Sequence, residues 1–361
     1  MTDFLTAHER EELNTQHWKC YYVSPNKTYK NIIRTKENRL AVVRHDHIMY
    51  RYEVQYKLGK GSFSDVYKVY DHAKKKYVAL KIIRNEKRFH KQGKEEIKIL
   101  EILKNIHNDT FIHMIDYFVF REHICITFAY HHHNLYEELK KRKFSGLHES
   151  ELYTVLIDSF NCLKTLYDNN IIHSDFKPEN MLISSETDNF RIKIIDFGSA
   201  CLMNNKKFTY IQSRFYRSPE IVLGLSYDMS IDIWSLGCIM FELATGNPLF
   251  PGSSEAELMI LFCELLGLPP IHFLKKSPRV SHFFTIRSDD YELLRTHDRK
   301  GTTRLPGTRS IEAILGSDAG SASEKHLLVD LIKKCLQWEP DKRIKPADAL
   351  KHPYFIVQYD V

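Results

Sequence analysis

"IIHSDFKPENMLI", residues 171–183, is the stretch of this sequence that most narrows the choice of fold. Asp175 follows an apolar, strand-like entry, with Lys177 two residues later and Asn180 five residues later. In phosphoryl transfer, an aspartate accepts the proton of the substrate hydroxyl, a lysine neutralises the transferring phosphate, and an asparagine carbonyl holds a magnesium ion. The stretch therefore predicts a phosphoryl-transfer site.

A second acidic motif follows in "IKIIDFGSA" (192–200). Asp196 stands at the end of an apolar strand and is predicted to be the second magnesium ligand, with Phe197 entering the core and Gly198 allowing the turn. Carboxylate and amide oxygens are the hard ligands that Mg²⁺ prefers. Asp175, Asn180 and Asp196 together therefore offer a base and two metal ligands.

A glycine-rich turn lies upstream, in "LGKGSFSDV" (58–66), between two predicted strands. Gly59 and Gly61 would let the backbone approach phosphate groups closely. Ser64 occupies the third glycine position of the usual pattern, so an ordinary hairpin is the alternative if the motif is taken alone.

The sequence "VALK" (78–81) supports the phosphate interpretation because it puts Lys81 on a strand between apolar residues. A buried ammonium group needs a partner of opposite charge. The helix that follows offers two acids, Glu95 and Glu96. A lysine–glutamate pair at this place would hold the amine against nucleotide phosphates.

Two later residues are predicted to be structural. Glu220, in "RSPE" (217–220), is expected to be buried and to pair with Arg343, while Asp232 is expected to anchor the loop that carries Asp175. Five motifs in this order are typical of one enzyme class and are very improbable as a chance set.

The polar segment "KKFTYIQSRFYRSPE" (206–220) places Tyr210 four residues before Arg214 and seven before Arg217. A surface cation–π contact is one interpretation. The other is that the tyrosine carries a phosphate, which the two arginines bind through charge-assisted hydrogen bonds.

The composition is that of a globular protein, with 43% apolar and 12% aromatic residues among 361. A formal charge of +6 is too small to indicate nucleic-acid binding. Seven dispersed cysteines without a CxxC pair predict reduced thiols and an intracellular location, in the cytoplasm or the nucleus. No apolar run approaches the roughly 18 residues of a membrane span, and no signal peptide is recognisable. We therefore expect a soluble monomer without nucleic-acid or membrane partners.

Residue patterns change character along the chain. Strand-like segments dominate from Tyr52 to about residue 129, interrupted by helical spacing at 94–106, and helical segments dominate beyond 134. This order predicts an α+β protein with two lobes of different class. The predicted parts are an N-terminal extension near the first lobe (1–51), the first lobe (52–129), the second lobe (130–355) with an insertion at about 268–325, and a short tail (356–361).

Over residues 52–355 the motifs resemble those of the eukaryotic protein kinases. Within them, "KIIRNEKRFHKQGKEEIKILEIL", "FTYIQSRFYRSPEIVLG" and "HDHIMYRYEV" resemble the dual-specificity tyrosine-regulated kinase family, class II branch. The resemblance implies a small antiparallel β-sheet lobe carrying a helix, called αC in this family, and a larger, mainly helical lobe.

The same resemblance assigns residues to the nucleotide site. It implies that Glu96 is the partner of Lys81, that Phe128 is the gatekeeper, and that the hinge passes through Ala129, Tyr130 and His131. The implied nucleotide-binding set is Leu58, Gly59, Lys60, Gly61, Ser62, Phe63, Ser64, Asp65, Val66, Ala79, Lys81, Phe128, Tyr130, Leu182 and Ile195. The implied catalytic set is Asp175, Lys177, Lys81 and Glu96, with Asn180 and Asp196 as Mg²⁺ ligands.

The resemblance also implies autophosphorylation of Tyr210, ringed by Arg214 and Arg217. Ser174 stands where most loop-phosphorylated kinases have an arginine, so the loop itself must supply the cations. Phe208 replaces the first tyrosine of many relatives, and the acidic run that usually precedes "HDHIMYRYEV" is not recognisable.

The implied activity is ATP- and Mg²⁺-dependent phosphorylation of serine or threonine in protein substrates, with proline after the acceptor and a basic residue before it. The alternative is a catalytically silent scaffold, but the lysine, base and metal ligands that silent relatives usually lose are present. A MAP kinase or a homeodomain-interacting kinase is a third interpretation, and the adjacent Thr209 and Tyr210 argue against the Thr-x-Tyr pattern of MAP kinases.

Overall fold

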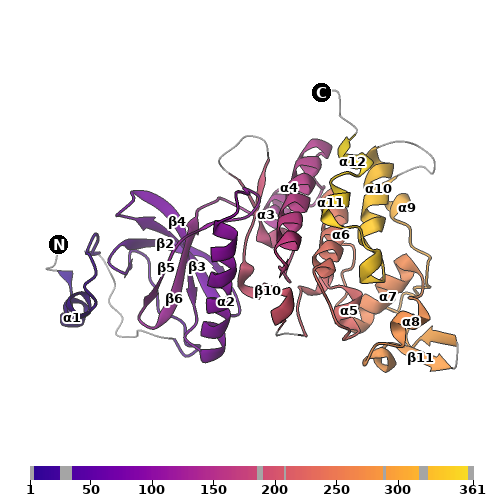
Figure 1. Cartoon of the computed structure of the whole chain (residues 1–361), viewed down its shortest axis with the longest axis horizontal. Helices are drawn as coiled ribbons and strands as arrows, with labels where there is room; N and C mark the ends of the chain where they lie inside the picture. Colours follow the sequence, from indigo (N-terminus) through magenta and orange to yellow (C-terminus); the bar gives the residue numbers. More distant parts are fainter. Residues whose placement is uncertain are drawn as a thin grey trace. The chain divides into compact units, whose positions relative to one another are not determined.

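The structure is a computed structural model that describes residues 4–24, 35–184, 190–206, 209–287, 290–316 and 324–356. The chain divides into two compact units (Figure 1). The first unit comprises Met1–His107 and Ile112–His131, and the second comprises Asn108–Phe111 and His132–Val361. Phe208, singled out above, lies outside the described residues.

The first unit is built on a six-stranded antiparallel sheet with strand order β1-β2-β3-β4-β6-β5. The strands are β1 (His47–Ile48), β2 (Tyr52–Lys60), β3 (Ser64–Asp71), β4 (Lys76–Ile83), β5 (Met114–Phe120) and β6 (His123–Ala129). Their β-branched and aromatic residues suit a pleated, half-buried surface. The strand-rich first third predicted from the sequence is confirmed.

The core of this unit includes residues from before the first long strand. Tyr50 is fully buried, as is Tyr52 at the start of β2, and Leu5, Val23 and Leu40 join the same apolar cluster. Helix α1 (Ala7–Gln16) begins with a capping box between Thr6 and Glu9. The predicted N-terminal extension therefore supplies part of the core of the first unit.

Helix α2 (Lys87–Lys104) begins seven residues earlier than the helical pattern predicted. The missed turns read "KRFHKQG", which has no repeating apolar face. Gly93 is buried, and it lies so close to Ile83 of β4 that an added Cβ atom would overlap the end of the Ile83 side chain. Close packing against β4, rather than a hydrophobic repeat, sets this part of the helix.

The second unit is mainly helical, as predicted. Its α-helices are α3 (Leu135–Lys141), α4 (Glu149–Asp168), α5 (Pro219–Val222), α6 (Ser230–Thr245), α7 (Glu255–Leu266), α8 (Ile271–Leu274), α9 (Ile311–Leu315), α10 (Glu324–Cys335), α11 (Pro346–Ala349) and α12 (Pro353–Ile356). Helix α6 is buried over most of its length, and its Trp234 packs against Phe250 and Phe262. A helix buried on most sides is a central element of its domain.

Short strand pairs and 3₁₀ turns position the polar loops of the second unit. The strands are β7 (Ile171–Ile172), β8 (Met181–Ile183), β9 (Ile192–Ile194), β10 (Cys201–Leu202), β11 (Phe284–Arg287) and β12 (Asp290–Leu293), paired as β7 with β10, β8 with β9 and β11 with β12. The predicted insertion at 268–325 contains α8, the β11–β12 hairpin and α9.

Among the described helices, none is both long and apolar enough to cross a membrane.

Candidate active site

A buried ion pair joins β4 to α2 in the first unit. The Nζ atom of Lys81 lies 2.6 Å from Oε1 of Glu96, and both side chains are almost fully buried. Glu95, the other acid offered by the sequence, contacts Lys98 on the helix surface at 3.4 Å. Because a buried ammonium group requires a partner of opposite charge, Glu96 holds Lys81 in one position.

The glycine-rich segment forms the turn between β2 and β3. The N–H of Gly61 donates to the carbonyl oxygen of Ser64 at 2.8 Å, which closes the turn. A Cβ atom at Gly59 would meet nothing within 4 Å, so the space beside this residue is open. Ser64, in the third glycine position, is buried and pairs with Ile83 of β4.

The other predicted nucleotide-binding residues lie on neighbouring strands of each unit. In the first unit, Val66 of β3 pairs with Lys81, and Ala79 of β4 pairs with Phe128 of β6. The hydroxyl of Tyr130, just after β6, lies 3.2 Å from that of Tyr56. In the second unit, Leu182 lies on β8, and the N–H of Ile195 donates to the carbonyl of Asn180 at 2.9 Å.

The loop after β7 brings the three polar residues of the first motif together. The Nζ atom of Lys177 lies 2.6 Å from Oδ2 of Asp175. The side-chain amide of Asn180, in a 3₁₀ turn, donates to the carbonyl oxygen of Asp175 at 2.9 Å and to its Oδ2 at 3.3 Å. These contacts fix the carboxylate from two directions.

Asp232, on α6, anchors this loop as the sequence predicted. Its carboxylate accepts the backbone N–H groups of His173 at 2.7 Å and Ser174 at 3.0 Å. Complete burial raises the pKa of Asp232 to about 7, although both hydrogen bonds act in the opposite direction. Ser174 has a φ angle of +68°, a conformation that its bonded neighbours stabilise.

Ser213 is a further residue of the site that the sequence did not reveal. Its hydroxyl donates to Oδ1 of Asp175 at 2.7 Å, its N–H donates to the same atom at 3.2 Å, and Lys177 Nζ lies 3.1 Å from the hydroxyl oxygen. Because 38 residues separate Ser213 from Asp175, no local spacing could have linked them. The hydroxyl bridges the two catalytic candidates.

The second acidic motif follows β9. Asp196 adopts a left-handed conformation with φ +63°, and its Oδ1 accepts the N–H of Gly198 at 3.3 Å. Phe197 is buried and lies edge-on to Phe111 and to His173. The ring therefore fixes the backbone that presents the Asp196 carboxylate.

The oxygen atoms of Asn180 and Asp196 in the second unit fit a magnesium ion whose remaining ligands are water and phosphate oxygens. In the parts of the chain that the structure describes, no group of three or more His, Cys, Asp and Glu residues is arranged to hold a metal. Asp196 and Asn180 instead offer one carboxylate and one amide oxygen. Mg²⁺ is commonly held by one or two protein oxygens, with water and substrate phosphates completing its octahedron.

Tyr210 lies on the surface, with 64% of its area exposed. The guanidinium carbon of Arg217 lies 4.1 Å from the ring centroid. Arg217 itself is buried and donates to the carbonyl oxygens of Ile211 and Gln212. Arg214, the other predicted receptor, is exposed and donates to the carbonyl oxygen of Ser253 at 2.7 Å.

Glu220 and Arg343 form the buried pair predicted from the sequence. The two guanidinium nitrogens lie 2.6 and 2.7 Å from the two carboxylate oxygens, and both side chains are fully buried. This bidentate geometry satisfies both charges. The pair fixes the end of the segment that contains Tyr210.

A pocket of about 560 Å³ lies beside Ser213 in the second unit. Two acids line it, Glu179 and Glu242. One carboxylate oxygen of Glu179 is buried with no hydrogen-bond partner, whereas Oε2 of Glu242 accepts the Tyr216 hydroxyl at 2.8 Å. Burial raises the pKa of Glu242 to about 7.

Comparison with known families settles the class of the chain. The family model described as "Protein kinase domain" matches residues 52–355. The chain belongs to the protein kinase family. The predicted kinase fold, with an antiparallel sheet unit and a helical unit, is confirmed.

Relatives of this kinase support the predicted resemblance to the dual-specificity tyrosine-regulated kinases. It is 45% identical over 324 residues to the dual specificity tyrosine-phosphorylation-regulated kinase mbk-2 of Caenorhabditis elegans, covering 87% of this chain and 40% of the relative. It is 42% identical over 375 residues to the dual specificity tyrosine-phosphorylation-regulated kinase 3 of Rattus norvegicus, and the match covers 97% of this chain and 63% of the relative. It is 41% identical over 366 residues to the dual specificity tyrosine-phosphorylation-regulated kinase 2 of Drosophila melanogaster, and the match covers 98% of this chain and 49% of the relative. The chain thus spans between two fifths and two thirds of the length of these relatives.

Proposed function

We propose that this chain is a dual-specificity protein kinase that transfers the γ-phosphate of ATP to serine or threonine of protein substrates. The observation that carries the proposal is the bonded set of Asp175, Lys177 and Ser213, with Asn180 on the same carboxylate. A base whose two oxygens are held by separate donors is already oriented before the substrate arrives. The membership of the protein kinase family supports the same activity.

Each of these residues has a proposed part in the transfer. Asp175 accepts the proton of the substrate hydroxyl, and Lys177 offsets the charge that develops on the transferring phosphate. Ser213 holds Oδ1 of Asp175 and so sets the direction in which the base accepts a proton. Asp232 keeps the loop rigid by binding the N–H groups of His173 and Ser174.

Asn180 and Asp196 are the residues proposed to hold Mg²⁺. A magnesium ion supplies charge neutralisation of the nucleotide phosphates when it is bound. The amide group of Asn180 donates to Asp175, which leaves its carbonyl oxygen as the ligand atom. Asp196 presents its carboxylate from a fixed left-handed turn.

The first unit is proposed to bind ATP. Lys81, held by Glu96, pairs with nucleotide phosphates, and the turn at residues 58–66 covers them. Within this unit, the adenine is proposed to contact Val66, Ala79, Phe128 and Tyr130. The corresponding domain proposal is a kinase domain at 52–355, preceded by an extension at 1–51 that contributes to the first unit and followed by a tail at 356–361.

Autophosphorylation of Tyr210 is the proposed activating event. Its support is the exposed hydroxyl-bearing ring and the Arg217 guanidinium against it. Phosphorylation adds a charge of roughly −1.5 to −2, which arginine meets with charge-assisted hydrogen bonds. Arg214 is proposed to turn from Ser253 toward the phosphate, since its side chain is exposed and one hydrogen bond holds it.

Substrates are proposed to carry a basic residue before the acceptor and proline after it. The pocket beside Ser213 supports the first preference, because Glu179 has an unpartnered buried carboxylate oxygen there. An arginine of the substrate would satisfy that oxygen and gain a charge-assisted hydrogen bond. The preference for proline is proposed from the family resemblance, with Arg217 shaping the backbone beside the acceptor.

An intracellular, monomeric protein is also proposed. All seven cysteines lie among the described residues and are free thiols, as expected for a reducing compartment. The location, whether cytoplasm or nucleus, is part of this proposal.

The proposed function is tested by comparing the freshly purified protein with its Asp175→Asn variant. Asparagine keeps the size of the side chain and loses the proton acceptor, so we expect transfer to fall by about 10²–10⁴-fold while the circular dichroism spectrum is unchanged. Intact mass and peptide mapping should find phosphate on Tyr210 in the wild type and none in the variant.

Two results would contradict this proposal. Activity of the Asp175→Asn variant near that of the wild type would refute the assignment of the base. A wild-type protein that binds partners but transfers no phosphate to any protein substrate would favour the silent scaffold.

A further inference from the structure

A short segment before the first long strand contacts the glycine-rich turn through one buried arginine. Arg39 is 7% exposed although it lies in a polar stretch of the sequence, "TKENR" at residues 35–39. Nη1 of Arg39 lies 2.8 Å from Oδ1 of Asp65, and Nε lies 2.8 Å from the carboxylate of Glu37. Two acids therefore hold the guanidinium group in a fixed orientation.

The remaining donors of Arg39 point at main-chain oxygens of the turn. Nη2 donates to the carbonyl of Gly61 at 2.8 Å and to that of Ser62 at 3.4 Å, while Nη1 donates to that of Ser64 at 3.3 Å. These are three of the four carbonyls between residues 61 and 64. Arginine has five N–H donors in a rigid plane, so a single side chain can hold several oxygens of one turn.

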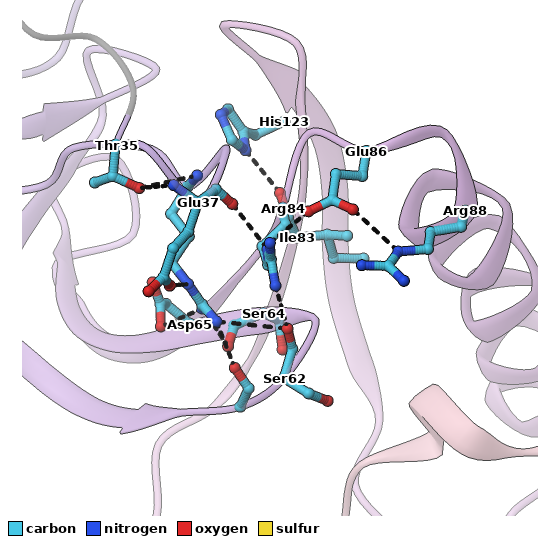
Figure 2. Close-up of polar contacts among 12 residues, drawn as sticks. Thr35, Glu37, Ser62, Ser64, Asp65, Ile83, Arg84, Glu86, Arg88 and His123 are labelled. Carbon is cyan, nitrogen blue, oxygen red and sulfur yellow. Dashed lines mark hydrogen bonds and ion pairs between the residues drawn. The ribbon is translucent and has the colours of Figure 1, made fainter. Parts of the chain in front are cut away.

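Arg84, the residue directly after β4, reinforces the same contact (Figure 2). Its Nη1 donates to the carbonyl of Ser62 at 2.9 Å, and its Nε donates to the carbonyl of Glu37 at 2.9 Å. Its backbone N–H donates to the carbonyl of Phe63 at 3.0 Å. Every carbonyl from Gly61 to Ser64 is thus bound by Arg39, Arg84 or both.

The contact also determines where the tip of the turn lies relative to the catalytic lysine. The ring of Phe63 covers the amine of Lys81, with Nζ 4.9 Å from the ring centroid. Phe63 is connected on both sides to residues whose carbonyls the arginines hold. The arginines therefore fix the distance between the glycine-rich turn and Lys81 within the first unit.

We propose that Arg39 is a positioning residue for the nucleotide, because it holds the glycine-rich turn in one conformation before ATP binds. The inference rests on the proposed kinase function, since it assumes that this turn covers ATP phosphates. A turn that is ordered in advance loses less conformational entropy when it closes on a ligand. The turn carries serine in place of its third glycine and aspartate directly after it, and Asp65 is the residue that recruits Arg39.

The test compares Arg39→Ala and Arg39→Lys with the wild type. The readouts are the Kd of a non-hydrolysable ATP analogue with Mg²⁺, and amide hydrogen exchange of residues 60–65 without nucleotide. For Arg39→Ala we expect a Kd about tenfold higher and exchange about tenfold faster, because the carbonyls lose their donors. Lysine keeps a charge for Asp65 but lacks the planar fork, so Arg39→Lys should retain thermal stability and still weaken binding.

Arg51→Ala is the matched control. Arg51 pairs with the buried Asp71 at 2.8 Å, at the opposite end of β3 from Asp65, so it tests the loss of a similar ion pair in the same sheet. We expect it to lower stability while leaving the Kd and the exchange of residues 60–65 within about twofold of the wild type. In steady-state assays, Arg39→Lys should raise the KM for ATP and leave kcat nearly unchanged.

The inference is overturned by wild-type Kd and exchange in the Arg39 variants, or by equal loss of nucleotide affinity in Arg51→Ala. It is also overturned if the wild-type protein binds no ATP analogue. A wild type that binds the analogue but transfers no phosphate would refute the proposed activity alone, and the Kd series would still decide the role of Arg39. If Arg39→Ala does not fold, the lysine variant decides between the outcomes.

Discussion

Tyr210 meets a guanidinium group even without a phosphate, because its ring lies against Arg217. Both interpretations offered by the sequence can therefore apply to the same pair, with the cation–π contact present before modification and the phosphate contact after it. Since phenylalanine keeps the ring, Tyr210→Phe removes the proposed phosphate site while preserving the contact with Arg217.

We expect Tyr210→Phe to lower kcat by about tenfold relative to the phosphorylated wild type, because the segment loses one to three charge-assisted hydrogen bonds. Limited proteolysis should cut the variant faster near residue 210. Phosphatase-treated wild type is the control and should behave like the variant. Unchanged kinetics together with unchanged protease sensitivity would argue against a phosphate clamp.

Glu242 is expected to give the proposed substrate pocket a dependence on pH. Because burial raises its pKa to about 7, the carboxyl group is mostly neutral at pH 6 and mostly charged at pH 8. Attraction for a substrate arginine therefore increases with pH across this range. We expect the KM for a peptide with arginine before the acceptor to fall by about threefold to tenfold from pH 6 to pH 8.

The control peptide for this measurement carries glutamine in place of arginine and should show a flat KM. In the Glu242→Gln variant, which keeps an acceptor for Tyr216, the arginine peptide should also lose its pH dependence. An identical pH profile for both peptides in the wild type would refute the assignment of Glu242.

At the scale of elements, the end of α6 depends on one glycine. Gly246 caps the helix with φ +78°, and its N–H donates to the carbonyl of Glu242 at 2.7 Å. A Cβ atom at this position would overlap the carbonyl oxygen of Phe144, which is main chain and cannot rotate away. Phe144 lies in the connection between α3 and α4, and this connection passes so close to the end of α6 that only glycine fits there.

We expect Gly246→Ala to lower the free energy of unfolding by about 3 kcal/mol or more, since backbone strain and steric overlap add. Gly316→Ala is the matched control, because Gly316 also caps a helix with φ +65° but has no atom within 4 Å of its Cβ position. That variant should cost about 1 kcal/mol. Urea unfolding measures both, and equal losses would contradict the steric argument.

Elements with strong periodicity were predictable from the sequence, and those set by packing were not. The helical spacing at residues 94–106 falls within α2 up to its end at Lys104. The first turns of α2 escaped prediction because their burial depends on Gly93 fitting against Ile83. Short motifs likewise identified Asp175, Asn180 and Asp196, since each lies within a local pattern.

Two residues that act over long sequence separations were found only in the structure. Ser213 reaches Asp175 across 38 residues, and Arg39 reaches Asp65 across 26. Helix and strand periodicity relate residues only a few positions apart, so neither spacing follows from it. Such distant pairs are brought together by the tertiary fold. Arg343 was predictable for Glu220 only through the family pattern of motifs.

At the scale of the whole molecule, the buried pair of Glu220 and Arg343 joins two segments that lie 123 residues apart in the sequence. We expect Arg343→Ala to lower the free energy of unfolding by about 3–5 kcal/mol, because it leaves a carboxylate buried without a cation. The double variant Glu220→Leu with Arg343→Met should lose less, since it removes both charges. Urea unfolding checks the order, and a double variant less stable than the single would contradict it.

The same pair has a consequence for the order in which the protein can be made. Glu220 leaves the ribosome 123 residues before its cation. At about 5–20 residues per second, translation of the intervening chain takes roughly 6–25 s. During that interval the carboxylate is more stable in water than buried in protein. The segment that contains Tyr210 therefore reaches its final structure late, after most of the helical unit has been synthesised.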